Sequence, residues 1–371
     1  MIESREIEAL AGIGLSPGLA AHLQCLAGEL SGQPMRVVEV QRDHLLLHDG
    51  RATCRASLSQ ALAEELQAQF DAPAVGDWVL AQQPGPGHWQ ARQLLPRASQ
   101  IARRTNDGRG GVQRQVVAAN VDTALLVMGL DHDFNLRRLE RYVMLAKLAG
   151  VAAVLVLTKA DTVDAVALEQ RLADARRLLP AEFAVVALVG RDAAGATQLG
   201  PWLRRGQTLV LLGSSGAGKS TLTNTLTGRP ANGPGGARVQ STGAVRDDDG
   251  RGRHTTTARS LHLTADGACI IDTPGLRALR LDIDSADDVL GAFDDIDRWS
   301  AHCRFRNCRH HDEPGCAVRQ AVPAKRLRNF HKLLREASHD SRSALERTEQ
   351  VAQWKLRHRA AMQRARMKHG G

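Results

Sequence analysis

The eight residues from Gly213 to Ser220 read GSSGAGKS and match the pattern G-x-x-x-x-G-K-[ST]. They follow a strand-like run, TLVLL, and precede a helix-like run, TLTNTL. In this context the glycines let backbone N–H groups turn toward phosphate oxygens, Lys219 reaches the β and γ phosphates, and Ser220 can ligate Mg²⁺. The flanking strand and helix disfavour the alternative of a purely structural glycine turn. The predicted phosphate-binding residues are Gly213, Ser214, Ser215, Gly216, Ala217, Gly218, Lys219, Ser220 and Thr221.

A second motif, DTPG from Asp272 to Gly275, closes the apolar run ACIID. A carboxylate at this point can hold Mg²⁺ through water, and the N–H of Gly275 can meet a γ-phosphate. Alone, the tetrapeptide could also be a turn with a helix cap. Together with the phosphate loop it predicts a magnesium site formed by Ser220 and Asp272.

Between these two motifs lies STGAVRDDDGRGRHTTT, residues 241–257, which is rich in glycine and charge. This composition is typical of a switch loop, in which a threonine hydroxyl completes the Mg²⁺ shell once a triphosphate is bound. Thr255, Thr256 and Thr257 are equal candidates for that ligand.

The segment TKAD, Thr158 to Asp161, ends the apolar run AAVLVL and resembles the guanine-reading motif N-K-x-D. The two oxygens of Asp161 can accept hydrogen bonds from guanine N1–H and N2–H₂, which adenine does not offer in that arrangement. Lys159 is expected to pack over the base, and Ala160 completes the motif. Because Thr158 replaces asparagine, we expect a weaker hold on the neighbouring loops. The alternative for this segment is a simple turn at the end of a strand. A second element that contacts the base, usually a Ser-Ala pair, is expected near Ala187-Leu188, but that pair is not readable there.

The order of these motifs is unusual. In ordinary GTPases the base-reading motif follows the phosphate loop, whereas here TKAD precedes it by about fifty residues. The termini of compact domains often lie close together, so the same sheet can form from a chain that is cut elsewhere. The order therefore predicts a circularly permuted α/β P-loop GTPase domain.

A cluster of soft ligands, Cys303-x₄-Cys308-x-His310-x₅-Cys316, offers three thiolates and one imidazole. Four protein ligands close a tetrahedral Zn²⁺ site and leave no position for water, so we expect one structural zinc ion. The alternative is a set of free thiols with His310 exposed beside His311.

The surrounding sequence predicts three kinds of domain. Five short strand-like runs between 35 and 98 indicate a small barrel, for which an OB-type fold is one common solution, and residues 1–34 form an extension without an assigned role. Residues 99–290 alternate apolar strands with helices, as a covered parallel sheet does, after a polar stretch at 99–116 that we expect to be an exposed loop. Residues 291–371 are expected to be a helical zinc-binding domain with a basic tail.

The chain carries a formal charge of +9, and residues 319–371 alone hold 14 Lys and Arg against 4 Asp and Glu. This concentration of charge favours an acidic polymer as partner of the tail, although a solvated helix face would look similar. No apolar run approaches the length of a membrane span, and the amino-terminal residues do not resemble a signal peptide. We therefore expect a cytoplasmic protein without a membrane partner.

These motifs together resemble the ribosome small-subunit-dependent GTPase A family. The resemblance covers about residues 35–335 and includes VGDWV, the permuted TKAD, GSSGAGKST, DTPG, GRHTTT and CRFRNCRHHDEPGCAV. It implies an amino-terminal OB domain and a carboxy-terminal zinc domain that grip 16S rRNA. It also implies that GTP, bound with Mg²⁺, is hydrolysed to GDP on the small (30S) ribosomal subunit late in its maturation, by a protein expected to be a monomer.

The catalytic group is less clear from the residues. Many GTPases place glutamine directly after D-x-x-G to orient the attacking water, but this chain has Leu276 there. The resemblance makes His254 the candidate replacement, and an exposed switch-loop histidine is the alternative. Two other interpretations remain open at this point: a non-catalytic, nucleotide-gated RNA-binding scaffold, and a P-loop ATPase or kinase, which Asp161 disfavours.

Overall fold

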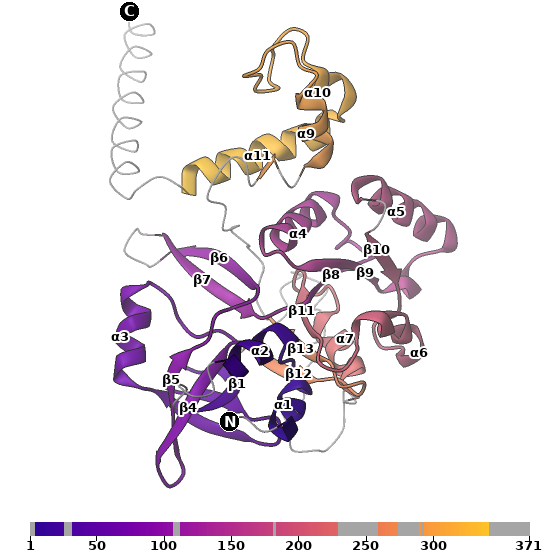
Figure 1. The fold of residues 1–371 in the computed structure, drawn as a ribbon. Coiled ribbons are helices and arrows are strands. Elements are labelled where there is room, and N and C mark those ends of the chain that lie inside the picture. Colours follow the sequence, from indigo (N-terminus) through magenta and orange to yellow (C-terminus); the bar gives the residue numbers. More distant parts are fainter. Residues whose placement is uncertain are drawn as a thin grey trace, which may run out of the picture. The chain divides into compact units, whose positions relative to one another are not determined.

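The structure is a computed structural model of the 371-residue chain. It describes residues 4–25, 32–106, 112–180, 183–228, 259–273, 289–290 and 293–340. The chain divides into two compact units (Figure 1). The first comprises Met1–Arg104 and Arg114–Asp282, and the second comprises Thr105–Gln113 and Ile283–Gly371. The predicted boundaries at residues 34, 98 and 290 stay predictions.

The first unit contains a largely parallel sheet with the strand order β10-β9-β8-β11-β13-β12. Its strands are β8 (Thr123–Gly129), β9 (Ala152–Thr158), β10 (Ala184–Ala187), β11 (Thr208–Leu212), β12 (Ser260–Leu263) and β13 (Cys269–Asp272). Only β12 runs antiparallel to its neighbour β13. Every residue of β8, β11 and β13 is buried, which explains why these strands read as unbroken apolar runs.

Helices connect and cover these strands, as the alternating pattern predicted. They are α4 (Leu136–Leu148), η1 (Ala160–Thr162), α5 (Ala165–Leu178), α6 (Ala193–Ala196), η2 (Thr197–Trp202) and α7 (Lys219–Leu226). Asn135 caps α4 and Asp164 caps α5, each with its side chain on backbone N–H groups of the first turn. Alternate strand residues such as Leu209 and Leu211 share a core cluster with Leu222 of α7. The helix after the phosphate loop is therefore fixed on the sheet.

The amino-terminal strands form the predicted β-barrel. Its strands are β1 (Gln33–Val40), β2 (Leu45–His48), β3 (Thr53–Leu58), β4 (Trp78–Gly85) and β5 (His88–Leu94). They follow the order β1-β2-β3-β5-β4, and pairing of β4 with β1 closes the ring. One helix, α3 (Gln60–Ala68), lies between β3 and β4 and was not predicted. The topology is consistent with the predicted OB-type barrel.

The barrel and the parallel sheet are joined edge to edge. Glu39 of β1 pairs with Ser260 of β12, so the two sheets form one eleven-stranded sheet. Arg36 on β1 is fully buried beside this seam, where its guanidinium donates to the carbonyl oxygens of Ile13 and Asn120 and lies 5.4 Å from the centre of the Trp78 ring. Burial lowers the pKa of Arg36. These contacts connect β1 with three other segments that are far from it in the sequence.

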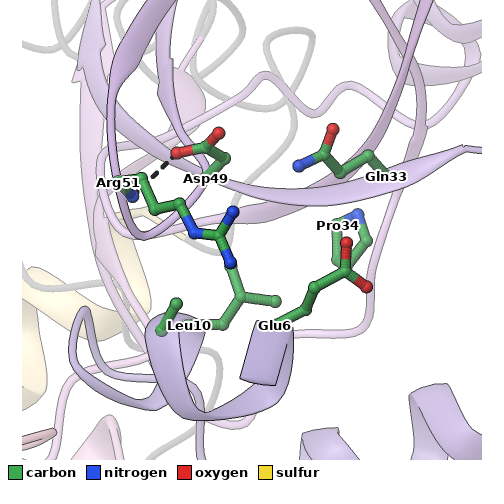
Figure 2. Close-up of a pocket in the computed structure, with 7 residues that line it drawn as sticks. Glu6, Leu10, Gln33, Pro34, Asp49 and Arg51 are labelled. Carbon is green, nitrogen blue, oxygen red and sulfur yellow. Dashed lines mark hydrogen bonds between the residues drawn. The ribbon is translucent and has the colours of Figure 1, made fainter. Parts of the chain in front are cut away.

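The amino-terminal extension also packs at this seam. It contains α1 (Ser4–Ala11) and α2 (Pro17–Cys25), and its apolar side chains share one core with barrel and sheet residues. That core comprises Leu10, Ile13, Leu15, Leu23, Trp78, Leu80, Leu95 and Cys269. Where α1 meets the start of β1 and the β2–β3 turn, a cavity of about 30 Å³ remains between Glu6, Gln33 and Arg51 (Figure 2). This volume holds about one water molecule, so α1 packs closely against the barrel at this point.

The polar stretch predicted as an exposed loop is mostly a β-ribbon. Strands β6 (Gln100–Asn106) and β7 (Val112–Ala119) form a separate two-stranded sheet (Figure 1). The loop prediction was therefore wrong for these residues. The arginines and glutamines toward the turn of the ribbon, such as Arg103 and Gln115, hid the short apolar stretches at its other end, where Ile101 and Val117 are fully buried.

The second unit is helical in its described part, with α9 (Asp294–Ser300), α10 (Ala317–Ala321) and α11 (Ala324–Asp340). Phe293 and Phe330 pack edge to face with ring centres 5.3 Å apart, and Arg326 forms a two-bond ion pair with Asp295. Among the helices that the structure describes, none combines the length and the hydropathy that a bilayer span requires. The basic tail after Asp340 lies outside the described residues.

Candidate nucleotide site and metal centre

The phosphate loop has the predicted strand–loop–helix setting. It begins directly after β11 and ends where α7 starts at Lys219. A Cβ on Gly213 would lie 2.4 Å from the backbone oxygen of Val127, so no larger residue fits there. Gly218 has a φ of +91°, which glycine adopts without strain. These two glycines let the loop turn tightly against the end of β8.

Lys219 is folded onto the loop that it follows. Its side-chain nitrogen Nζ donates to the carbonyl oxygens of Gly213 at 2.8 Å and Ser214 at 2.7 Å, and the residue is 8% exposed. The ammonium group is therefore held against the phosphate loop, within reach of a phosphate bound by that loop. Ser220 and Thr221 follow in the first turn of α7 and are half-buried.

Thr158 links the base-reading motif to the phosphate loop. Its side chain is almost fully buried, and Oγ1 lies 2.6 Å from the carbonyl oxygen of Ala217. A Cβ on Gly218 would lie 3.2 Å from the same hydroxyl, so the two loops are in close contact. The threonine hydroxyl thus contacts the backbone of the phosphate loop directly, and the weaker hold expected of threonine stays a prediction.

Lys159 is positioned by an acidic residue that the sequence analysis missed. Its φ of +59° is in the left-handed region, and its Nζ lies 2.7 Å from Oδ2 of Asp131 in the loop after β8. Burial alone would raise the pKa of Asp131, but the hydrogen bond from Lys159, the backbone hydrogen bond from Asp133 and the charge of Lys159 lower that pKa overall. Asp131 is therefore ionised at neutral pH and fixes the ammonium group of Lys159.

Asp133 in the same loop contacts the phosphate loop through its side chain. Its Oδ1 accepts a hydrogen bond from the Ser214 hydroxyl, and its Oδ2 accepts from the Gly129 N–H at 3.0 Å. Arg138 of α4 forms an ion pair with the same buried carboxylate. The acidic pattern D-x-D, which begins two residues after the end of a buried strand, was the available sequence signal for both residues.

Asp161, the predicted guanine reader, already has a partner. Its Oδ2 accepts a hydrogen bond from Nη2 of Arg191 at 2.8 Å, and both side chains are substantially exposed. Arg191 follows β10, in the loop where the second base-side element was expected. The Ala160 N–H donates to the carbonyl oxygen of Leu188 at 3.3 Å, so this loop does lie beside the TKAD motif.

Asp272 ends β13 and is 2% exposed. In the parallel register it pairs with Leu211, two residues before Gly213, so its carboxylate lies at the edge of the sheet where the phosphate loop begins. An oxygen ligand at that place together with the Ser220 hydroxyl fits the predicted magnesium site. Gly275, His254, Leu276 and the candidate threonines 255–257 lie outside the described residues.

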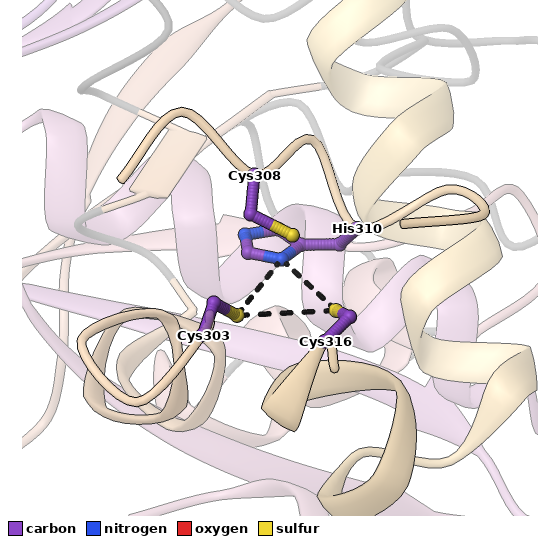
Figure 3. A group of neighbouring side chains, drawn as sticks. All are labelled: Cys303, Cys308, His310 and Cys316. Atoms are coloured by element: carbon purple, nitrogen blue, oxygen red, sulfur yellow. Dashed lines mark hydrogen bonds between the residues drawn. The ribbon is translucent and has the colours of Figure 1, made fainter. Parts of the chain in front are cut away.

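The zinc ligands predicted from the sequence converge in the second unit (Figure 3). The ligand atoms of Cys303, Cys308, His310 and Cys316 all lie within 4.8 Å of one another. The Sγ atoms of Cys303 and Cys316 are 3.9 Å apart, close to the roughly 3.8 Å edge of a tetrahedron with Zn–S bonds of about 2.3 Å. Nδ1 of His310 lies 3.4 Å from Sγ of Cys316 and 3.6 Å from Sγ of Cys303. The donor set therefore fits a zinc ion.

The fold and the nucleotide site together define the class of protein. A phosphate loop after β11 and a base-reading motif after β9 meet at one sheet edge, while the base-reading strands come first in the chain. This is the arrangement of a circularly permuted P-loop GTPase.

Comparisons with known proteins give the family. A family model described as RsgA GTPase matches residues 94–282. The small ribosomal subunit biogenesis GTPase RsgA of Mesorhizobium japonicum is 41% identical over 343 residues, which cover 90% of this chain and 91% of that protein. RsgA 2 of Vibrio vulnificus is 43% identical over 284 residues, covering 75% and 76%. The chain belongs to the RsgA GTPase family, and it is a GTP hydrolase.

Solved structures support the fold. YjeQ from Thermotoga maritima superposes with a TM-score of 0.58 at 21% identity, over 82% of this chain and 98% of that one. YloQ, described as a circularly permuted GTPase, superposes with a TM-score of 0.57 at 19% identity, over 84% and 97%. The circular permutation inferred from the motif order agrees with the description of YloQ.

Proposed function

We propose that this GTPase binds the small (30S) ribosomal subunit, acts late in its maturation and hydrolyses GTP faster when bound to it. The observation that carries the proposal is the relatives at 41–43% identity over most of the chain, which are named small ribosomal subunit biogenesis GTPases. The family's GTPase activity argues against the non-catalytic scaffold, in which hydrolysis would be incidental.

In the proposed reaction the phosphate loop from Gly213 to Thr221 holds the phosphates of GTP with its backbone N–H groups. The ammonium group of Lys219 exchanges its contacts with the two loop carbonyls for contacts with β and γ phosphate oxygens. Ser220 and Asp272 would hold Mg²⁺, which neutralises developing phosphate charge when it is bound with GTP. The Asp133–Ser214 and Thr158–Ala217 contacts keep the loop in its binding shape before GTP arrives.

Guanine is read by the TKAD segment in this proposal. The carboxylate of Asp161 accepts hydrogen bonds from the guanine N1–H and N2–H₂ groups. Before guanine can bind in this way, the hydrogen bond from Arg191 to Asp161 must break. The aliphatic part of Lys159 packs over the base while Asp131 holds its ammonium group. Adenine leaves the Asp161 carboxylate without matching donors, which is why we expect strong discrimination against it.

The attacking water needs an orienting group, and we assign this role to His254 because Leu276 cannot perform it. Gly275 donates its N–H to the γ-phosphate, and one of Thr255, Thr256 and Thr257 completes the magnesium shell. Slow intrinsic turnover and stimulation by the subunit follow if the partner orders this switch segment.

The barrel and the zinc-binding unit are proposed to contact 16S rRNA, with the zinc ion in a structural role. The barrel has the closed five-strand order of oligonucleotide-binding barrels, and the basic end of the chain suits a phosphate polymer. We propose that the protein works as a monomer in the cytoplasm.

Co-sedimentation tests the proposed partner. The full-length protein is mixed with purified small or large ribosomal subunits in the presence of a non-hydrolysable GTP analogue or GDP. The proposal requires binding to small subunits that is stronger with the GTP analogue than with GDP, and much weaker binding to large subunits. Equal binding to both subunits would reject it.

A further inference from the structure

Two half-buried arginines converge on one amide oxygen in the first unit. Arg103 of β6 donates from Nε at 3.1 Å and from Nη2 at 3.0 Å to Oε1 of Gln115 on β7. Arg259, which directly precedes β12, donates from Nη2 to the same oxygen at 3.5 Å. Among the residues that the structure describes, no carboxylate lies within ion-pair distance of either guanidinium.

Among the described residues, this arrangement brings together two positive charges without a negative one. Two positive charges share a single neutral acceptor, the Oε1 atom of Gln115. The two guanidiniums repel each other because they are close together and carry like charge. Burial and then the charge of Arg103 lower the pKa of Arg259, and burial lowers that of Arg103. The described part of the β6–β7 ribbon adds Arg104 and Arg114 and contains no Asp or Glu. A bound anion would relieve the repulsion and supply the missing acceptors.

The position of the site indicates where such an anion comes from. Ser260, next to Arg259, pairs with Asp272, so the arginine cluster lies at the same edge of the sheet as the nucleotide site. However, β12 is two strands away from β11, which is on the order of 10 Å. The phosphates of the nucleotide are held by the loop after β11, so they are not the natural ligand of this cluster.

We propose that Arg103, Gln115 and Arg259 form a binding site for a backbone phosphate of RNA. This proposal rests on the proposed function, because that function requires binding to the small subunit, whose RNA supplies the backbone phosphates. Paired guanidiniums bind a phosphate through several parallel N–H···O bonds, and the Gln115 amide can turn its NH₂ group toward the same anion. Because Arg259 lies next in the chain to the segment that ends at residue 258, RNA bound here contacts the chain immediately after the predicted switch loop.

Gln115→Glu tests the site by placing a carboxylate of the protein itself where the RNA phosphate is proposed to bind. The new carboxylate pairs with both arginines, so the free protein should melt at a higher temperature than the wild type. The same carboxylate repels an RNA phosphate, so binding to small subunits should weaken about tenfold, and the salt dependence of log K should become shallower by about one unit of slope. A merely structural role of the cluster does not combine higher stability with weaker RNA binding.

Arg103→Gln with Arg259→Gln provides a second variant that removes the charges. It should show the same loss in affinity and in salt slope, while its affinity for GDP and GTP stays that of the wild type. The matched control is Arg176→Gln with Arg204→Gln, which removes two exposed arginines from other parts of the same unit. The control should bind subunits with nearly the wild-type salt slope.

The outcomes separate the possibilities. If the wild type binds small subunits and both site variants bind with the same affinity and slope, this inference is wrong and the proposed function stands. If the wild type does not bind small subunits, the proposed function fails. A loss of GTP affinity in the double variant would assign the cluster to the nucleotide. Inorganic phosphate is also added to the wild-type protein as a probe of the cluster. If it raises the melting temperature while the variants bind subunits as the wild type does, the cluster binds free phosphate and RNA is rejected as the source of the bound phosphate.

Discussion

Thr158 shows what a residue type can and cannot predict. The sequence places it in the first position of a guanine-reading motif, where a side chain must tie neighbouring loops together. The structure shows that the shorter side chain does so through a 2.6 Å contact with the Ala217 carbonyl, which no sequence pattern reveals. Asp131, Asp133 and Arg191 belong to the same category, because each acts on a motif residue that is distant in the chain.

Thr158→Val should weaken GDP binding about tenfold and lower the free energy of unfolding by about 1–3 kcal/mol. The variant keeps the shape of the side chain but leaves the buried carbonyl oxygen of Ala217 without its donor. Titration calorimetry and denaturant unfolding measure the two effects. Thr197→Val is the matched control, because its hydroxyl also donates at 2.6 Å but on an exposed helix end. Equal GDP affinity of the wild type and Thr158→Val would show that this contact does not shape the site.

Asp161→Asn should loosen GDP by about a hundredfold and gain affinity for xanthosine diphosphate. An amide offers an N–H donor that suits the extra carbonyl of xanthine, whereas it meets the guanine N1–H group with a donor of its own. Fluorescent nucleotide displacement measures both affinities. Asp174→Asn removes an aspartate with an arginine partner elsewhere, at Arg177, and should change neither. Retained preference for guanine in Asp161→Asn would mean that another residue reads the base.

At the scale of elements, strands that form continuous apolar runs were predictable and the β6–β7 ribbon was not. The runs at β8, β11 and β13 are buried on both sides and read as continuous apolar segments. In the ribbon, the buried residues form short blocks at one end (101–102 and 116–119) and the arginines lie toward the other end, so neither strand shows a period of two. Helix α3 was missed for a different reason, since it lies within a region interpreted as strands and turns.

Removing the zinc ion should unfold part of one unit and leave the other intact. Cys316→Ser deprives the cluster of a buried ligand, so it should lose its single Zn²⁺ ion together with helical signal from the second unit. GDP affinity should stay within about twofold, because the nucleotide site lies in the first unit. Elemental analysis, circular dichroism and nucleotide binding report these effects. Cys25→Ser, at an exposed cysteine outside the cluster, should retain the metal; wild-type protein purified without any zinc would contradict the assignment.

At the scale of the whole molecule, the motif order was the most informative sequence feature, and the connections between domains were the least predictable. The permuted order of TKAD, GSSGAGKS and DTPG indicated the sheet and its family. The edge pairing of Glu39 with Ser260 and the packing of α1 and α2 at the seam depend on distant tertiary contacts. One consequence is that β12, directly after the predicted switch loop, is bonded to a strand of the barrel.

Phosphate release measured with GTP and with ATP, each with and without purified small ribosomal subunits, tests the central claim most directly. The account predicts slow release from GTP alone, release that rises by at least about tenfold with small subunits, and no subunit-dependent release from ATP. The guanine-reading carboxylate and the partner-dependent switch must both be correct for this pattern to occur. A GTP hydrolysis rate that small subunits leave unchanged, or equal stimulation with ATP, would contradict the account.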